Sequence, residues 1–120
     1  MKVGRKATGG KYRRLKKKRL SGRQKESRIV KLSEKKVKVI RGMGGRKKLV
    51  AFAENSVNVI VKGKAKKVEI KTVVETPSNT FLARQNILVK GAIIETELGK
   101  AKITNRPSQE GHVQAVILSE

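Results

Sequence analysis

The chain has 120 residues and a mass of 13.3 kDa, and its 31 Lys and Arg residues outnumber nine Glu residues to give a formal net charge of +22. It contains no Cys, no Trp and one His. These counts exclude thiolate metal sites, thiol catalysis, disulfides and multi-histidine sites, so we expect no metal, no cofactor and no small-molecule substrate. No apolar run reaches the roughly 20 residues of a membrane-spanning helix, and the first residues lack the apolar stretch of a signal peptide. We therefore expect a cytoplasmic protein that does not engage a membrane.

The amino-terminal segment has the densest charge. Residues 1–28 hold 13 Lys and Arg and one Glu, a net charge of +12, whereas residues 29–50 have a net charge of +7 and residues 51–120 a net charge of only +3. Glycines interrupt the first segment and its few apolar residues define no face, so it cannot bury enough apolar surface to offset the entropy of ordering. We predict a basic arm over residues 1–28 that is disordered when free, and a folded body over residues 29–120.

Val and Ile dominate the body in patterns that are typical of β-strands. We predict strands at residues 36–41, 48–53, 57–62, 66–74, 87–90, 92–98, 101–106 and 112–118. Between the fourth and fifth of these, Ser78 or Asn79 is expected to cap one short helical turn that ends at Arg84.

Glycine-containing turns separate several of these strands. Lys62-Gly63-Lys64-Ala65 predicts a hairpin turn, and Leu98-Gly99-Lys100-Ala101 predicts a two-residue turn with Gly99 at its first central position. Many short strands joined by such turns favour a mainly β fold, a barrel or a sandwich, over anything with a parallel sheet. We predict a small antiparallel β-barrel with an extended basic amino-terminal arm, because closure removes exposed strand edges.

Self-repulsion at this charge density indicates a polyanionic partner, which could be RNA, DNA or an anionic membrane surface. The arm lacks the apolar face and the Trp or Phe of a membrane-binding helix. Its cations fit the neutralisation of phosphates along a groove, although a run of like charge can be merely solvated and Lys16-Lys17-Lys18-Arg19 resembles a nuclear import signal. Phe52 is expected in the core, which leaves only Tyr12 and Phe81 for stacking. We therefore expect contacts to phosphates and to nucleic-acid shape rather than to stacked bases.

Two glycine-rich basic segments are candidates for contact with phosphate. The first is Thr8-Gly9-Gly10-Lys11 and the second is Arg41-Gly42-Met43-Gly44-Gly45-Arg46-Lys47-Lys48. Gly-rich loops can bring backbone amides against phosphate, but a plain hairpin turn explains the glycines equally well. Neither segment is a nucleotide-binding P-loop, because the Gly-Lys-Ser/Thr motif is missing.

Catalytic chemistry has few candidates. Glu95 and Glu97 are two residues apart and would share one face of a strand, as paired acid and base groups can. A charged solvent face beside Lys100 and Lys102 explains the same pattern, and His112 is expected at the surface near the start of the last strand. We therefore expect that the protein is not an enzyme.

Three stretches resemble a known family. Residues 84–118 are similar to the carboxyl-terminal half of the archaeal and eukaryotic small-subunit ribosomal protein family S8e, residues 66–79 also match, and Arg5-Lys6-Ala7-Thr8-Gly9-Gly10-Lys11 resembles the amino-terminal signature of the family. Eukaryotic members carry an insertion that is missing here, so the chain resembles the archaeal type. That likeness weakens the reading of residues 16–19 as a nuclear import signal.

The resemblance implies a structural component of the small ribosomal subunit, with a β-barrel seated on ribosomal RNA, a basic arm threaded among RNA helices, and neighbouring ribosomal proteins as further partners. No catalysis is associated with the family. Together with the charge pattern it suggests the following RNA-binding residues: Arg5, Lys6, Thr8, Gly9, Gly10, Lys11, Arg13, Arg14, Lys16, Lys17, Lys18, Arg19, Arg23, Lys25, Arg28, Arg41, Arg46, Lys47, Lys48, Arg84 and Arg106.

Two other functions stay open on the sequence alone. The first is a ribosome-biogenesis or condensing protein that binds nucleic acid without a unique site, since charge alone does not distinguish the two. The second is an RNA-processing enzyme that uses Glu95 and Glu97.

Overall fold

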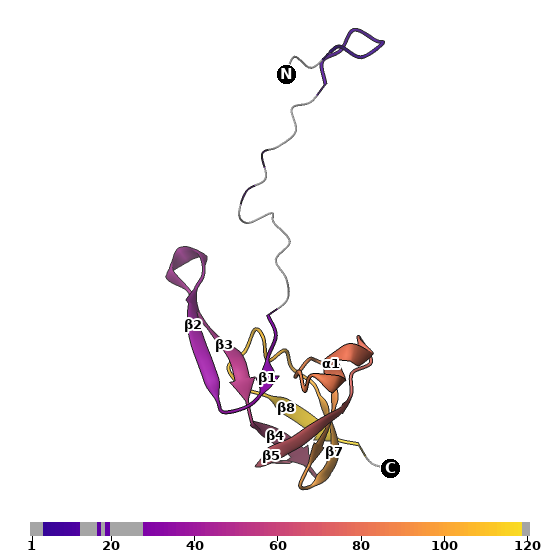
Figure 1. The fold of residues 1–120 in the computed structure, drawn as a ribbon. Coiled ribbons are helices and arrows are strands. Elements are labelled where there is room, and N and C mark those ends of the chain that lie inside the picture. The colour runs from indigo at the N-terminus through magenta and orange to yellow at the C-terminus, as the bar shows by residue number, and fades with distance from the viewer. Residues whose placement is uncertain (1–3, 13–16, 18, 20–27, 119–120) are drawn as a thin grey trace.

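The computed structural model describes residues 4–12, 17, 19 and 28–118, and most of the described chain is β-structure (Figure 1). Its elements in chain order are β1 (Lys31–Leu32), β2 (Lys36–Arg41), the 3-10 turn η2 (Met43–Gly45), β3 (Lys47–Glu54), β4 (Ser56–Val61), β5 (Lys64–Glu75), α1 (Thr80–Arg84), β6 (Ile93–Thr96), β7 (Gly99–Ile103) and β8 (Gln114–Ile117).

The last five strands form a closed barrel in the order β4-β5-β6-β7-β8. Consecutive strands pair antiparallel, and the barrel closes through a parallel pair, β4 with β8, in the register Asn58 to Gln114 through Ile60 to Val116. An odd number of strands in an up-and-down path forces this seam, because the first and last strands then run in the same direction. The predicted small barrel is confirmed, but the prediction of purely antiparallel pairing missed the seam.

Small and β-branched side chains fill the barrel. Val57 and Val59 are buried while Asn58 and Ile60 between them are exposed, as the alternation of a strand requires. Alanines on β7 and β8 and before β6 are fully buried, which suits the narrow interior of a five-stranded barrel. Phe52, which we expected in the core, is only half-buried and lies outside this cluster.

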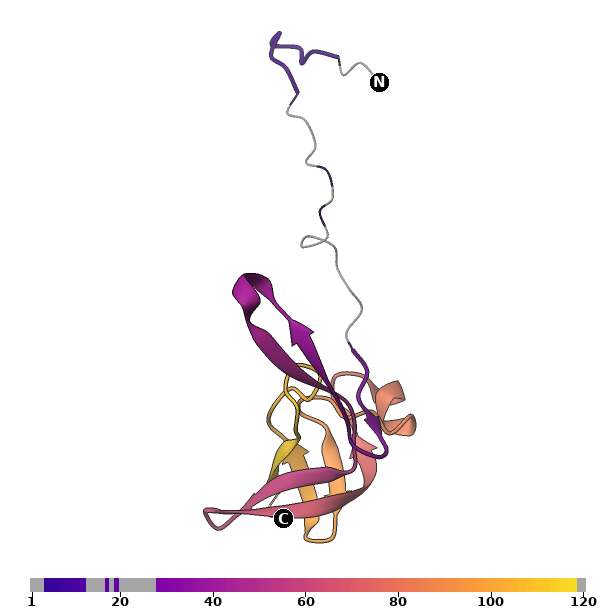
Figure 2. The same cartoon turned by 90° about the vertical axis from the view of Figure 1, so that its left-hand side faces the viewer.

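A three-stranded sheet of order β1-β3-β2 adjoins the barrel. The β2–β3 hairpin, here called the ribbon, stands away from the barrel in both views (Figures 1 and 2). Its base is fixed to the barrel, because the Ala51 N–H donates to the carbonyls of Pro107 (3.2 Å) and Glu110 (3.0 Å), and Ala51 and Val30 belong to the common core.

The strand predicted at residues 87–90 is wrong. Ile87 makes one isolated bridge with Lys31, and the Leu88 N–H donates to the Val30 carbonyl at 2.8 Å. Ile87 and Leu88 are both buried although they are adjacent, so the run covers an end of the core and does not present alternate faces.

The turn predicted around Gly99 is displaced by two residues. Thr96 pairs with Gly99, so Glu97 and Leu98 are the central residues and Gly99, with a φ of 114°, begins β7. The Thr96 hydroxyl donates to the Gly99 carbonyl at 2.8 Å and fixes this arrangement. The strands predicted at 92–98, 101–106 and 112–118 are accordingly shorter in the structure, whereas the helical turn capped by the Asn79 side chain is confirmed.

Glu54 is a buried charge at the junction of the ribbon and the barrel, with 1% of its surface exposed. The Ser56 hydroxyl donates to its Oε1 at 2.9 Å. Lys35 Nζ lies 3.1 Å from its Oε2, an ion-pair distance without hydrogen-bond geometry. Lys35 is therefore the compensating charge for a carboxylate that has lost most of its solvation.

We predict that Lys35→Gln lowers the free energy of unfolding by about 1–3 kcal/mol, because it leaves a buried carboxylate unpaired. The measurement is urea denaturation followed by circular dichroism. Lys64→Gln is the matched control, since it removes an equal charge at an exposed site and should be neutral or slightly stabilising. Adding Glu54→Gln to Lys35→Gln should restore part of the loss. Equal stabilities of the Lys35 and Lys64 variants would contradict this role for the pair.

Candidate nucleic-acid interface

The glycine signature near the amino terminus folds into a local turn. Arg5 and Lys11 form an antiparallel bridge, and the Lys6 N–H donates to the Gly10 carbonyl at 2.9 Å. Gly9 has a φ of 79°, a conformation that other residues rarely adopt. The Arg5 guanidinium donates to the Gly9 carbonyl at 3.1 Å, and Lys6 Nζ lies 5.8 Å from the centre of the Tyr12 ring. The turn thus brings three exposed cations together over a few residues.

Part of the predicted arm has no structural description. Lys17 and Arg19 are described only as exposed. The other predicted contacts of this stretch, and the expected disorder of the free arm, stay predictions because they lie outside the described residues: Arg13, Arg14, Lys16, Lys18, Arg23 and Lys25.

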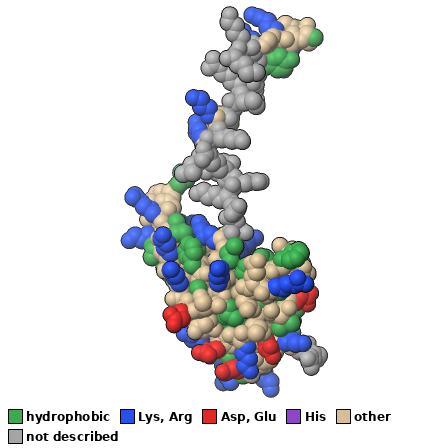
Figure 3. All heavy atoms as spheres, in the orientation of Figure 1, with side chains coloured by type: hydrophobic (Ala, Val, Ile, Leu, Met, Phe, Trp, Pro, Cys, Tyr) green, Lys and Arg blue, Asp and Glu red, His purple; other side chains and the backbone are tan. Residues whose placement is uncertain are grey.

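The tip of the ribbon concentrates the second basic segment. Arg41 at the end of β2 pairs with Lys47 at the start of β3, and Lys48 pairs with Ile40. Between the strands, η2 tightens the tip and leaves Met43 95% exposed. The two ion pairs among the described residues are Lys35–Glu54 and Glu110–His112, so none of the tip cations has a carboxylate partner there. Figure 3 shows Lys and Arg gathered on the ribbon, whereas acidic and basic side chains are mixed over the barrel below it.

A groove of about 500 Å³ separates the ribbon from the loop between β7 and β8. Its lining residues are Arg46, Lys47, Lys48 and Leu49 on the ribbon and Gln109, Glu110, Gly111 and His112 on the loop. Lys48 Nζ donates to Gln109 Oε1 at 3.0 Å. The loop approaches closely because residue 111 is glycine: a Cβ there would lie 3.1 Å from the Leu49 Cβ.

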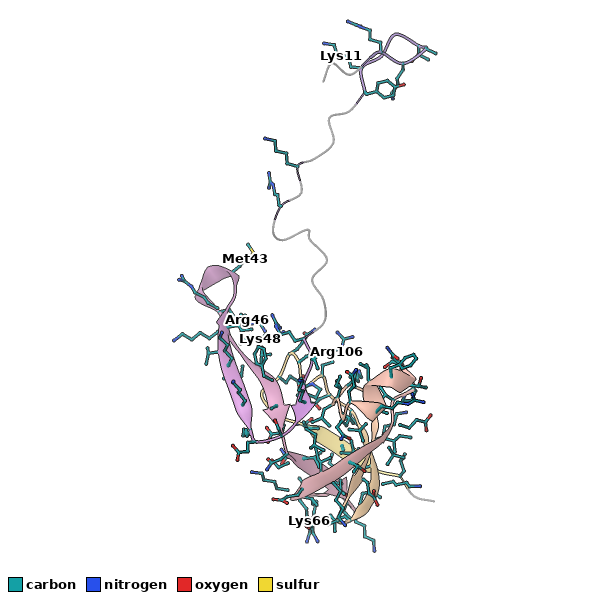
Figure 4. The ribbon with its side chains drawn as sticks, viewed as in Figure 1. Lys11, Met43, Arg46, Lys48, Lys66 and Arg106 are labelled. Atoms are coloured by element: carbon teal, nitrogen blue, oxygen red, sulfur yellow. The ribbon has the colours of Figure 1, made fainter. Side chains whose placement is uncertain are left out.

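The structure brings predicted residues from distant parts of the sequence to this end of the body. Arg46, Lys48 and Arg106 lie on the same side of the molecule, with Lys66 at the opposite end of the barrel (Figure 4). The Arg28 guanidinium donates to the Ser108 carbonyl at 3.4 Å, so the start of the body joins the same loop. Arg84 lies apart, on α1.

Sequence reasoning missed the loop side of the groove. Gln109, Gly111 and His112 gave no signal, because their proximity to the ribbon depends on a contact between segments about 60 residues apart in the chain. The exposed apolar pair Val39 and Leu49 on the ribbon was also missed. An Ile/Val-rich strand normally predicts burial, whereas this ribbon extends beyond the core that would cover it.

The arrangement can bind anions without competition from neighbouring carboxylates. Exposed guanidinium and ammonium groups on a rigid ribbon present several donors for phosphate oxygens. Glu110 at the rim is engaged by Asn105, whose Nδ2 donates to its Oε2 at 2.7 Å. Among the described residues, no group of three His or acidic side chains is placed to hold a metal ion. No helix of the described chain is both long and apolar enough to span a membrane.

The candidate catalytic carboxylates do not form the expected pair. Glu95 is on β6 opposite Lys100 and accepts from the Thr72 hydroxyl at 3.3 Å. Glu97 lies beyond the end of β6 in the turn, so the two do not share a strand face. His112 precedes β8, with its Nε2 3.0 Å from the Gln114 amide nitrogen and 4.0 Å from Glu110.

Comparison with known proteins agrees with this surface chemistry. The sequence model described as ribosomal protein S8e matches residues 1–118. The protein named small ribosomal subunit protein eS8 of Methanococcus aeolicus is 44% identical over 119 residues, covering 97% of this chain and 93% of its own length. The proteins of that name from Methanocella arvoryzae and Methanocorpusculum labreanum are 40% and 44% identical, covering 98% and 95% of this chain and 96% and 93% of their own lengths. The chain belongs to the ribosomal protein S8e family.

Proposed function

We propose that this protein is a structural constituent of the small ribosomal subunit in the cytoplasm and binds ribosomal RNA through phosphate and shape contacts. Family membership supports the ribosomal role, because relatives that match over nearly their whole length are named small-subunit proteins. The observation that supports RNA contact most directly is a set of cations at the ribbon end without a carboxylate partner among the described residues: Arg41, Arg46, Lys47, Lys48 and Arg106. The role needs no reaction, and its partners are ribosomal RNA and neighbouring ribosomal proteins.

The ribbon supplies geometry as well as charge. Its cations are fixed by strand pairing and by the contact of Ala51 with the loop, so they present a preformed pattern of donors. Phosphate contacts of this kind position a protein on folded RNA, and they discriminate by the shape in which the backbone is held. The groove beside the ribbon offers room for one strand of RNA backbone between basic and polar walls.

The arm supplies a second, longer contact. We propose that residues 5–28 follow RNA phosphates, with the turn around Gly9 making a close approach through exposed backbone and flanking Arg5 and Lys11. Each phosphate neutralised releases counterions, so log K for RNA should fall with log salt by about 0.7–0.9 per contact.

Deletion of residues 1–27 tests the division of labour between arm and body. We expect the β circular dichroism spectrum and the urea midpoint to persist, because the barrel core lies outside the deleted segment and Arg28 still reaches Ser108. RNA affinity and its salt slope should both fall sharply, since 12 cations are lost. An unfolded truncation, or an unchanged slope, would contradict separate arm and body roles.

A charge-matched pair of variants tests the ribbon. Replacing Arg46, Lys47 and Lys48 with Gln should weaken binding to small-subunit RNA by at least about tenfold and lower the salt slope by about 2–3. Replacing Lys62, Lys64 and Lys66 with Gln removes the same charge at the opposite end of the barrel (Figure 4) and should have a much smaller effect. The measurement is a filter-binding titration over a salt series.

Equal losses in the two triple variants would contradict a localised interface. That result would favour the alternative in which the protein binds nucleic acid without a unique site, because only total charge would then matter. Circular dichroism of both variants confirms that folding is preserved.

A further inference from the structure

Phe81 is an exposed aromatic side chain on the folded body. It lies on α1, a single helical turn whose start is fixed by the Asn79 side chain, which accepts from the Phe81 N–H at 3.1 Å. The ring is 67% exposed, so it contributes little to the core. The chain has only three aromatic residues, and Phe52 is half-buried on the ribbon.

A cation accompanies the exposed ring. The guanidinium carbon of Arg84 lies 5.9 Å from the centre of the Phe81 ring, within the range of a cation–π contact. The two residues are three apart on the helix and therefore share one face. The guanidinium and the ring thus form a paired surface that is both planar and positively charged.

Arg84 also borders a hollow of about 350 Å³ between α1 and the end of β5. The hollow has an apolar part, lined by Val73, Val74 and Ala83, and a polar part, lined by Glu75, Thr76 and Thr80. Glu75 and Thr80 are exposed, so a carboxylate acceptor and a hydroxyl group are available to a ligand. A flat ligand with polar edges and a nearby negative charge fits this combination.

The position of α1 connects this feature with the ribbon. In both ribbon views α1 and the ribbon lie at the same end of the body, with β1 between them in Figure 1 (Figures 1 and 2). Apolar and basic side chains lie next to each other over α1 in the space-filling view (Figure 3). RNA held by the ribbon would therefore have a second point of contact on the same side of the molecule.

We propose that Phe81 and Arg84 form a stacking platform for one unpaired base of the bound RNA, with Arg84 also reaching the phosphate of that nucleotide. The inference rests on the proposed RNA-binding function and adds a subsite that recognises a single-stranded nucleotide. Base–aromatic stacking tolerates any base and depends on ring area, whereas the exposed Glu75 carboxylate favours a base with an exocyclic amino group. A purely apolar protein partner would leave the Arg84 charge without a role at the site.

The sequence argument against stacking as the main mode of binding still holds. One platform adds an anchor at a single nucleotide, while phosphate contacts along the ribbon and arm supply the remainder. This arrangement predicts that loss of Phe81 changes affinity without changing the number of phosphates neutralised.

A tryptophan reporter tests the proposal directly, because the chain has no Trp. Phe81→Trp in the full-length protein should show fluorescence quenching when small-subunit ribosomal RNA is added, as expected for an indole stacked on a base. Binding is followed independently by gel shift. Phe81→Leu, which keeps apolar volume but removes the ring, should weaken binding about tenfold with an unchanged salt slope. Leu98→Ala, an exposed apolar control on the barrel, should leave binding unaltered.

Arg84→Gln should weaken binding and lower the salt slope by about 1, and Arg84→Lys should restore the slope but not the full affinity. RNA binding without a change in the indole fluorescence of the Phe81→Trp variant, or with normal affinity for Phe81→Leu, would overturn the platform and leave the ribosomal role intact. A blue shift that needs added ribosomal proteins would also overturn it, in favour of a protein contact. Failure of the unaltered protein to bind the RNA at all would instead overturn the proposed function.

Discussion

Mutual repulsion among 31 cations, with only nine carboxylates to oppose it, is the constraint on which this structure depends. A small barrel can fold under this constraint only if the charges project away from its interior. The core is accordingly built from Val, Ala, Ile and Leu, and Glu54 is a buried carboxylate at its margin. Cations are placed on protruding elements such as the ribbon, where water solvates them and a polyanion can reach them.

The junction between ribbon and barrel turns this charge into a shape. The Ala51 N–H binds two carbonyls of the β7–β8 loop, and Gly111 lets that loop approach Leu49. The ribbon therefore leaves the barrel in a defined direction although its outer half has little core beneath it. Preformed donors lose less conformational entropy on binding than donors on a flexible chain, so the same charges bind more selectively.

Local chemistry made much of the fold predictable. Lys62 and Gly63 both have positive φ, as the predicted two-residue hairpin requires, and Asn79 caps α1 as its position before a short apolar run suggested. Features that depend on distant contacts were not predictable. The two-residue strand β1 exists only because it pairs with β3, and residues 87–90 have β propensity but are used to cover the core. The displaced turn near Gly99 depends on a hydroxyl contact that propensity does not encode.

The candidate interface divides in the same way. Charge density alone identified the arm and the ribbon tip, because cations without neighbouring Glu are visible in the sequence. The groove wall formed by Gln109 to His112 and the exposure of Phe81 needed the three-dimensional structure. Phe81 illustrates the reason: an aromatic residue in a short helical turn is buried or exposed according to how the helix packs, which its neighbours in sequence do not determine.

The central claim is that RNA engages the ribbon end of a rigid barrel, and directed hydroxyl-radical probing tests it most directly. The chain has no Cys, so Met43→Cys at the ribbon tip and Lys66→Cys at the opposite end each provide a unique site for a tethered iron chelate. In the complex with small-subunit ribosomal RNA, the account predicts strong cleavage at a few discrete RNA positions from residue 43 and weak cleavage from residue 66. Equally strong or equally diffuse cleavage from both sites would contradict it.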